Sequence, residues 1–280
     1  MPPKLSNNYS AETKAQIKQA DLVLLACDYE GTLVPMALSD EEVRMAETVH
    51  EHLISLSQIP SVRLAIISSS SLIDLREKIT LQNCHYLCNH GLEIFGPELN
   101  FHHTVAEKFR QCIYEAANTL KTQVRVERAF VEDRGLTAGL NYRSVMEDQV
   151  SSLLAKVRNL LANSVRERKI RIEEARRMIE ILPAVDWDRG KAVKMLYQHF
   201  RAEYPGKNIV LLYVGDDAMD EPAFRFALTC GIPYRVTQTR VTDARYYLKM
   251  QTEISRVLKL VRENASDATP ERALREKVVL

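Results

Sequence analysis

The sequence predicts a doubly wound α/β fold, in which helices cover both faces of a parallel sheet, with a small α+β unit inserted into it. Two apolar runs, at residues 22–27 and 209–214, end abruptly in acidic residues. Buried parallel strands end in this way at the carboxyl edge of an open sheet, where such folds bind ligands. Strand-like and helix-like segments alternate around both runs, whereas the segment between them has a β-β-α-β-β order.

The first part of the sheet is expected between residues 20 and 91. The predicted helices are 11–20, 43–54 and 72–79, and the predicted strands are 22–27, 62–67 and 86–88. Ser39-Asp40-Glu41-Glu42 supplies an N-cap and first-turn acids for the second helix, whose apolar residues recur at helical spacing. The strand at 62–67 runs into four serines, and the strand at 86–88 opens onto Asn89-His90-Gly91.

The pattern changes near His102 and returns after Pro183. The inserted unit is predicted to contain a helix at 105–120, strands at 123–131 and 136–142, a helix at 150–162, and strands at 169–173 and 177–182. A helix then opens around Trp187 and runs through Phe200, and the alternating series continues to about Val261. The expected organisation is a core domain of residues 1–103 and 184–262, an α+β domain of residues 104–183, and a flexible tail of residues 263–280.

The composition is that of an ordinary soluble globular chain. Of the 280 residues, 46% are hydrophobic and 27% are charged, and the formal net charge is +1. No nucleic-acid surface or polybasic membrane patch is therefore expected. The five cysteines show neither a paired framework nor a zinc-site spacing, which favours buried reduced thiols. Residues 1–10 lack a leader pattern, and no segment approaches the ~20 apolar residues of a membrane helix, so a cytoplasmic protein is expected.

Clustered acids follow both apolar strands and suggest a shared divalent-cation site. Asp28 and Glu30 follow the first strand, and Asp216, Asp217 and Asp220 follow the second. Neighbouring parallel strands end at the same edge of a sheet, and Mg²⁺ prefers a few protein oxygens together with water. Two structural interpretations compete with a metal site: an aspartate that caps the turn after its strand, and a solvated helix start whose acids suit the helix dipole.

Four motifs in order give the chain a family resemblance. They are Asp28-x-Glu30-Gly-Thr-Leu, Ser68, Lys191 and Gly-Asp216-Asp217-x-x-Asp220-Glu221. In this order they resemble the motifs of the haloacid dehalogenase superfamily. Asn89-His90-Gly91, Asn141-Tyr142-Arg143 and Phe224 make the chain most similar to trehalose-6-phosphate phosphatases over about residues 20 to 262. The resemblance implies a haloacid dehalogenase-like core, with residues 104–183 as a cap that closes over the substrate and excludes water.

The resemblance assigns a role to each motif residue. Asp28 would be the nucleophile that forms an aspartyl-phosphate, and Glu30 stands at the general acid/base position. Ser68 would donate its hydroxyl to a phosphate oxygen, although four serines in a row also suit a polar turn. Lys191 would neutralise the phosphate and the aspartate as a point cation.

The resemblance also implies magnesium as the cofactor. Its protein ligands would be the carboxylates of Asp28 and Asp216 and the backbone carbonyl of Glu30. Asp217 and Asp220 would fix a ligand and hold the lysine.

Charged residues of the cap are expected to contact the sugar. Glu132, Arg134, Arg143 and Glu180 match the sugar-contacting positions of the family, with Arg134 in place of a frequent lysine, and Arg176 or Arg177 could act similarly. As charges on cap strands they could equally be solvated. His90 is expected to orient the loop or the substrate, a structural role being the alternative. Tyr142 and Trp187 are expected to pack.

Four positions of these motifs depart from the family pattern. Ser69 and Ser70 replace the glycine and arginine of a common Ser-Gly-Arg loop, and Met219 replaces a usual threonine. Glu30 replaces the aspartate that serves as general acid and then as general base. The additional methylene moves the proton donor by about 1 Å, and such a misplacement can cost about 100-fold in rate. Metal binding is unaffected, because residue 30 contributes only its backbone carbonyl.

The leading hypothesis is a magnesium-dependent phosphatase that converts trehalose 6-phosphate to trehalose and phosphate. One alternative keeps the chemistry but changes the substrate to sucrose phosphate or another glycosyl phosphate. The other is a phosphosugar-binding or regulatory domain with weak or lost turnover, which the departures at Glu30, Ser69, Ser70 and Met219 would suit. The expected partner is a small sugar phosphate, and the resemblance adds a trehalose-phosphate synthase as a protein partner.

Overall fold

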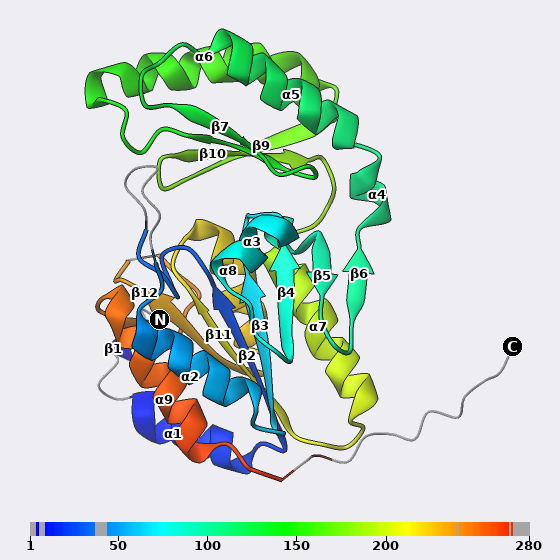
Figure 1. Cartoon of the computed structure of the whole chain (residues 1–280), viewed down its shortest axis with the longest axis vertical. Coiled ribbons are helices and arrows are strands. Elements are labelled where there is room, and N and C mark those ends of the chain that lie inside the picture. Colours follow the sequence, from blue (N-terminus) through cyan, green and yellow to red (C-terminus); the bar gives the residue numbers. More distant parts are fainter. Residues whose placement is uncertain (1–3, 6–8, 37–43, 240, 269, 271–280) are drawn as a thin grey trace, which may run out of the picture.

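The chain forms a core and a cap, each built around its own sheet (Figure 1). The computed structural model describes residues 4–5, 9–36, 44–239, 241–268 and 270. The predicted N-cap at 39–42 and most of the predicted tail lie outside these residues. Among the described residues, no helix is long and apolar enough to cross a membrane.

The core sheet has nine strands in the order β1-β13-β12-β11-β2-β3-β4-β5-β6. The strands β1 to β4 and β11 to β13 run parallel, and β5 and β6 add an antiparallel edge. Their bounds are Lys4–Leu5 (β1), Leu22–Asp28 (β2), Val62–Ile67 (β3), Cys84–Cys88 (β4), Glu93–Phe95 (β5), Asn100–His102 (β6), Ile209–Gly215 (β11), Gly231–Val236 (β12) and Tyr246–Leu248 (β13). The chain leaves β2 toward β3 and returns beside it as β11, which makes β2 the point where the strand order reverses and where ligands bind.

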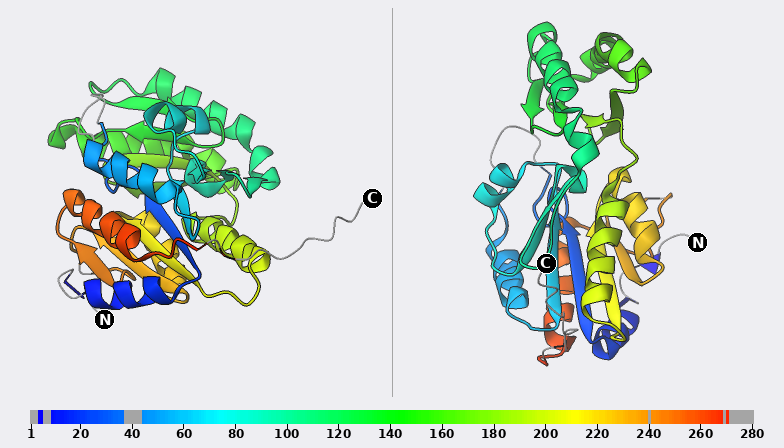
Figure 2. Two further views of the ribbon diagram at one scale, coloured as in Figure 1. Left: turned by 60° about the horizontal axis from the view of Figure 1, so that its bottom comes forward. Right: turned by 90° about the vertical axis from the view of Figure 1, so that its right-hand side faces the viewer.

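Helices cover both faces of this sheet, as the fold class predicts (Figures 1 and 2). The elements are α1 (Tyr9–Gln19), α2 (Glu47–Ser57), α3 (Leu72–Lys78) and α9 (Ile254–Asn264) on one face, and α7 (Arg189–Glu203) and α8 (Glu221–Ala227) on the other. Successive side chains of β2 point to opposite faces: Val23 and Leu25 pack with the first group of helices, and Leu24 packs with the second. This two-sided burial explains why the parallel strands appear in the sequence as continuous apolar runs.

The cap is a four-stranded antiparallel sheet with two helices on one face. Its elements are β7 (Phe130–Asp133), β8 (Ala138–Asn141), β9 (Ile170–Ala175), β10 (Met178–Pro183), α5 (Arg110–Gln123) and α6 (Glu147–Arg166), and its strand order is β7-β8-β10-β9. Residues of both helices pack on the outer face of the sheet, and the opposite face is turned toward the core (Figure 1). The short helix α4 (Thr104–Glu107) connects β6 to α5.

Two predicted elements differ from the structure. The predicted strand at 123–131 is wrong for most of its length, because the helical pattern of Ile113 and Leu120 carries α5 to Gln123 and β7 begins only at Phe130. The predicted helix at 105–120 is divided into α4 and α5 around Phe109. Trp187 packs where the chain returns from cap to core, as expected: it stacks on Phe101, and its indole donates to the carbonyl of Gly91 at 2.9 Å.

Candidate active site

A cavity of about 330 Å³ lies between the carboxyl edge of the core sheet and the inner face of the cap sheet. Its walls contain eight of the residues to which the family resemblance assigns a role: Asp28, Glu30, His90, Glu132, Arg134, Arg143, Glu180 and Asp217. They come from the ends of separate strands and from loops far apart in the chain. The position of the cavity, beside β2, is the one that the strand order predicts.

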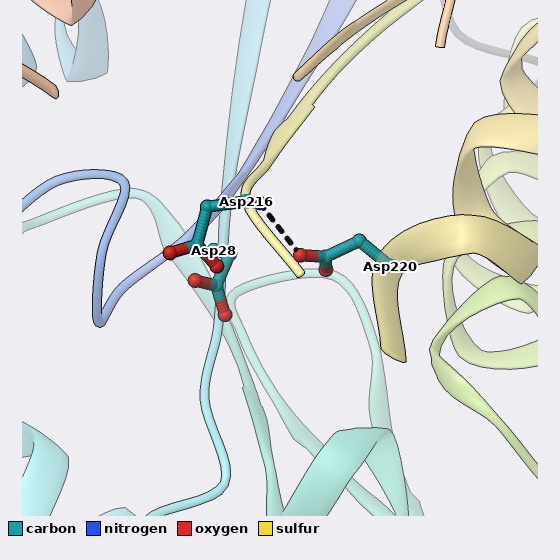
Figure 3. A group of neighbouring side chains, drawn as sticks. All are labelled: Asp28, Asp216 and Asp220. Atoms are coloured by element: carbon teal, nitrogen blue, oxygen red, sulfur yellow. Dashed lines mark hydrogen bonds between the residues drawn. The ribbon is translucent and has the colours of Figure 1, made fainter. Parts of the chain in front are cut away.

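Three buried carboxylates meet at the floor of this cavity. Asp28 ends β2 and Asp216 directly follows β11, and the two strands pair through Cys27 and Val214. Carboxylate oxygens of Asp28, Asp216 and Asp220 lie within 4.8 Å of one another (Figure 3). An all-oxygen set of this size suits a hard divalent cation such as magnesium.

Asp220 holds the loop that carries Asp216. Its Oδ2 accepts from the backbone nitrogens of Asp216 at 2.8 Å and Asp217 at 3.2 Å, and its Oδ1 accepts from the hydroxyl of Tyr213 at 2.6 Å. Because these groups and Arg189 occupy both of its oxygens, Asp220 positions the loop, and Asp28 and Asp216 are the carboxylates that fit a cation. The sequence also expects Asp28 and Asp216 as the ligands, which stays a prediction, and Asp220 pairs with Arg189 rather than with the expected lysine.

Arg189, and not Lys191, is the cation beside these carboxylates. Its Nη1 donates to Oδ1 of Asp28 and to Oδ1 of Asp220, both at 2.7 Å, and the side chain is buried. Burial alone would lower the pKa of Arg189, but the Asp220 and Asp28 carboxylates raise it well above its usual value. The guanidinium is therefore a permanent positive charge at the floor of the cavity.

The prediction for Lys191 is wrong for a geometric reason. Asp188 is the N-cap of α7, so Arg189 is the first helical residue and faces the core. Lys191 follows two residues later, about 200° around the helix, and its ammonium pairs with Asp186 outside the cavity. Asp188 before an apolar helical pattern was a signal that could have placed Arg189 correctly.

Burial raises the pKa of Asp28 well above its usual value, and the positive charge of Arg189 opposes that shift. Burial likewise raises the pKa of Asp217, with Asp220 adding to the shift and Arg189 and Arg176 opposing it. The carboxylates at the floor thus depend on cations to remain ionised.

Glu30 lies in the turn after β2 and is bound by three neighbours. The hydroxyl of Ser68 donates to its two carboxylate oxygens at 3.0 and 3.2 Å, the hydroxyl of Ser70 lies 3.3 Å from Oε1, and the ammonium of Lys78 lies 3.7 Å from Oε1. Ser68 is therefore brought to the site, but its hydroxyl faces Glu30. No sequence motif points to Lys78, because it stands at the end of α3, ten residues after Ser68.

The turn at Glu30 requires a glycine next to it. Gly31 has a φ of +88°, and a Cβ added there would lie 1.7 Å from Oδ2 of Asp216. The two acidic loops consequently approach each other more closely than any other residue type would permit.

A buried ionic network forms the roof of the cavity. Arg134 donates to Glu180 at 2.7 Å and to Glu132 at 2.6 Å, and Nε2 of His90, from the core, lies 3.2 Å from the same oxygen of Glu180. Burial would raise the pKa of Glu180, but Arg134 and His90 lower it to about 2. Burial lowers the pKa of His90, against the influence of Glu180. Arg134 and Glu180 are therefore paired and buried rather than solvated, whereas their contact with a sugar stays a prediction.

The hairpin turn between β9 and β10 brings a second arginine to the floor. Arg176 donates to the backbone carbonyl of Asp216 and pairs with its carboxylate, whereas Arg177 pairs with Glu147 within the cap at 2.6 Å. Both turn residues have a positive φ, of 50° and 57°. Of the two candidates that the sequence left open, Arg176 lines the cavity, and its backbone carbonyl also accepts from Arg143 at 3.4 Å.

The remaining predicted residues have clear positions. Ser69, Ser70 and Met219 line the cavity, so the departures from the family pattern lie inside the site. Tyr142 is buried in the cap, and its hydroxyl donates to Glu174 at 2.6 Å, in keeping with its expected packing role.

Comparisons with known proteins agree with this geometry. Residues 26–251 match the trehalose-phosphatase family. A probable trehalose-phosphate phosphatase 3 of Oryza sativa subsp. japonica is 27% identical over 269 residues, which cover 89% of this chain and 71% of that protein.

Solved structures show the same fold. The trehalose-6-phosphate phosphatase C-terminal domain of C. albicans aligns with a TM-score of 0.79 at 17% identity, covering 94% of this chain and 98% of that one. The trehalose synthase regulatory protein C-terminal domain of Candida albicans aligns with a TM-score of 0.66 at 12% identity, covering 94% and 99%. The fold is therefore that of the haloacid dehalogenase-like phosphatases, and because the match extends over most of the chain, this protein belongs to the trehalose-phosphatase family.

Proposed function

We propose that this protein is a magnesium-dependent phosphatase that hydrolyses trehalose 6-phosphate to trehalose and inorganic phosphate. The observation that carries the proposal is the arrangement of one cavity. Its floor holds a buried aspartate pair with an arginine, and its roof holds a buried network of carboxylates and arginine. The floor suits a phosphoryl group with its cation, and the roof suits a polyhydroxylated sugar.

The residues of the floor fit a magnesium ion. Carboxylate oxygens of Asp28 and Asp216, with the backbone carbonyl of Glu30, would hold it, and it would supply positive charge to the phosphoryl oxygens. Asp220 would keep Asp216 in place through the two backbone hydrogen bonds of its loop.

In the first step, an oxygen of Asp28 forms a bond to phosphorus as the bond between phosphorus and the sugar oxygen breaks. The proton that the leaving oxygen needs comes from the carboxyl group of Glu30. Arg189 holds Asp28 in position and balances its charge before the attack.

In the second step, water attacks the phosphorus of the aspartyl-phosphate. Glu30 now accepts a proton from this water, the bond from phosphorus to Asp28 breaks, and inorganic phosphate leaves. Glu30 gives up one proton in the first step and regains one in the second, so the enzyme returns to its starting state.

The choice of sugar rests on the roof and on the relatives. Glu132, Arg134 and Glu180 offer charged hydrogen-bond donors and acceptors that suit the hydroxyl groups of a sugar. Because these charges already balance one another in part, the sugar needs no charge besides its phosphate. The relative from Oryza sativa subsp. japonica is described as a probable trehalose-phosphate phosphatase. A trehalose-phosphate synthase would supply this substrate, and we propose it as the partner.

Phosphate release from a panel of sugar phosphates tests the proposal. Purified protein is incubated with trehalose 6-phosphate, sucrose phosphate and glucose 6-phosphate, each with magnesium and with a chelator, and Asp28→Asn serves as the inactive control. We expect the highest kcat/KM for trehalose 6-phosphate and no release without the metal. Equal rates on all three substrates would remove the disaccharide assignment, and a higher rate on sucrose phosphate would replace it.

Sugar-phosphate binding without efficient turnover is the second candidate function. It is favoured by the glutamate at position 30, whose carboxylate is engaged by Ser68 and Lys78, and by Arg176, which neutralises Asp216. Calorimetry on the same preparation distinguishes the two functions, because this candidate requires micromolar binding of trehalose 6-phosphate with no phosphate release during the measurement.

A further inference from the structure

The carboxylate of Glu30 is held from one side by a rigid loop. Ser68 is completely buried, and its Oγ accepts from the backbone nitrogen of Ser70 at 3.0 Å while donating to Glu30. The backbone carbonyls of Ser68 and Ser70 accept from His90 and Asn89, each at 3.0 Å. The two serine hydroxyls that face Glu30 therefore have positions fixed by the core.

Lys78 approaches the same carboxylate from the last residue of α3. Its Nζ lies 3.7 Å from Oε1 of Glu30 and 6.0 Å from the centre of the Tyr29 ring, and its side chain lines the cavity. Both of these partners stand in the turn after β2. The ammonium thus approaches the segment that carries the general acid/base, although the side chain is also exposed to solvent.

A glutamate requires such support more than an aspartate does. Its side chain has one additional rotatable bond, so its carboxylate can occupy several places within the cavity. A catalytic group acts efficiently only when it is held near the productive geometry.

We propose that Lys78 and Ser70 are positioning residues, which hold the carboxylate of Glu30 where it serves the leaving sugar oxygen. The cavity is in this sense adapted to glutamate at position 30. This inference rests on the proposed phosphatase function.

The two kinds of leaving group distinguish positioning from a general structural effect. A sugar alkoxide leaves only when it receives a proton, so its departure depends on where Glu30 is held. A p-nitrophenolate leaves without a proton, so the first step with this substrate should be insensitive to that position, whereas the hydrolysis of the aspartyl-phosphate uses Glu30 with either substrate.

Steady-state kinetics with trehalose 6-phosphate and p-nitrophenyl phosphate test the inference. The variants are Lys78→Met, Lys78→Arg and Ser70→Ala. Lys259→Met is the matched control, because Lys259 is also exposed and also pairs with a glutamate at 3.7 Å, on α9. We expect Lys78→Met to lower kcat/KM for trehalose 6-phosphate about tenfold and to change kcat/KM for p-nitrophenyl phosphate less than about twofold, because kcat/KM reports the step that forms the aspartyl-phosphate. Lys78→Arg and Lys259→Met should remain near the wild-type rate, and Ser70→Ala should follow Lys78→Met.

The outcomes separate this inference from the function on which it rests. If the wild type turns over substrate, an unchanged Lys78→Met variant or an equal loss of kcat/KM on both substrates overturns the inference alone. A wild-type protein that hydrolyses neither substrate overturns the proposed function and this inference with it. In the background of Glu30→Gln, where no proton donor remains, the Lys78→Met change should have no further effect, and a further tenfold loss there would contradict the positioning role.

Discussion

At the scale of single residues, the chemistry of the site depends on side chains whose direction is set by their neighbours. Arg189 and Lys191 are both cations near the start of α7, and only the first of them faces the carboxylates. A buried arginine between two aspartates is costly to remove, because the two buried carboxyl groups then lose the positive charge that compensates them.

Arg189→Met should therefore reduce turnover by more than about 100-fold and lower the free energy of unfolding by about 3–5 kcal/mol. Lys191→Met should change both quantities little, since Lys191 pairs at the surface with Asp186. Phosphate release and urea unfolding measure the two effects. The opposite ranking of the variants would restore the role that the sequence motif assigned to Lys191.

Glu30→Asp tests whether the cavity is adapted to the longer acid. Shortening the side chain moves the carboxylate about 1 Å away from Ser70 and Lys78, so we expect kcat for trehalose 6-phosphate to fall about tenfold or more. An increase in kcat of tens-fold would show instead that glutamate impairs the enzyme, as the comparison with the family pattern alone suggested.

At the scale of elements, the turn between β9 and β10 connects the cap to the floor of the site. Arg176 bonds to Asp216 of the core, whereas Arg177 bonds within the cap. Arg176→Ala should weaken the contact between cap and core, raise KM several-fold and increase hydrogen exchange in the turn. Arg177→Ala, its neighbour in the same turn, should leave KM within about twofold. Equal effects of the two variants would argue against a specific contact with the core.

The network around Glu180 makes a prediction about acid stability. The pKa of this carboxyl is lowered from 4.5 to about 2, so its stabilising contribution is complete above about pH 4.5 and is lost as the pH falls toward 2. The shift corresponds to about 3 kcal/mol. Glu180→Gln should lower the free energy of unfolding near neutral pH, and the difference from wild type should shrink below pH 4.5. A difference that stayed constant over this range would contradict the pairing with Arg134.

At the scale of the whole molecule, the sequence predicts the architecture better than it predicts contacts. The apolar runs that end in Asp28 and Asp216 identify two buried strands, because burial on both faces of the sheet excludes polar residues. The two acids also mark the edge of the sheet at which these neighbouring strands end. The inserted sheet follows from the change in element order. The strand predicted at 123–131 failed because residues 124–129 connect α5 to β7 without strand pairing, which begins only at Phe130.

The site could be predicted only in part, for reasons of geometry. The order of the family motifs predicted Lys191 as the cation of the site. Because α7 begins directly after Asp188, it is Arg189 that faces the site. Whether Arg176 or Arg177 reaches the site depends on the conformation of a tight turn. Two adjacent arginines carry no sequence signal that distinguishes them. Lys78 joins Glu30 only through tertiary packing of α3.

The most direct test of the central claim is to detect the covalent intermediate. Protein mixed with magnesium and trehalose 6-phosphate carrying a radiolabelled phosphoryl group is quenched in acid and digested. We predict that label appears on the peptide containing Asp28, is released by hydroxylamine, and is absent from Asp28→Asn. Steady phosphate release with no label on that peptide, or label retained by Asp28→Asn, would contradict the account.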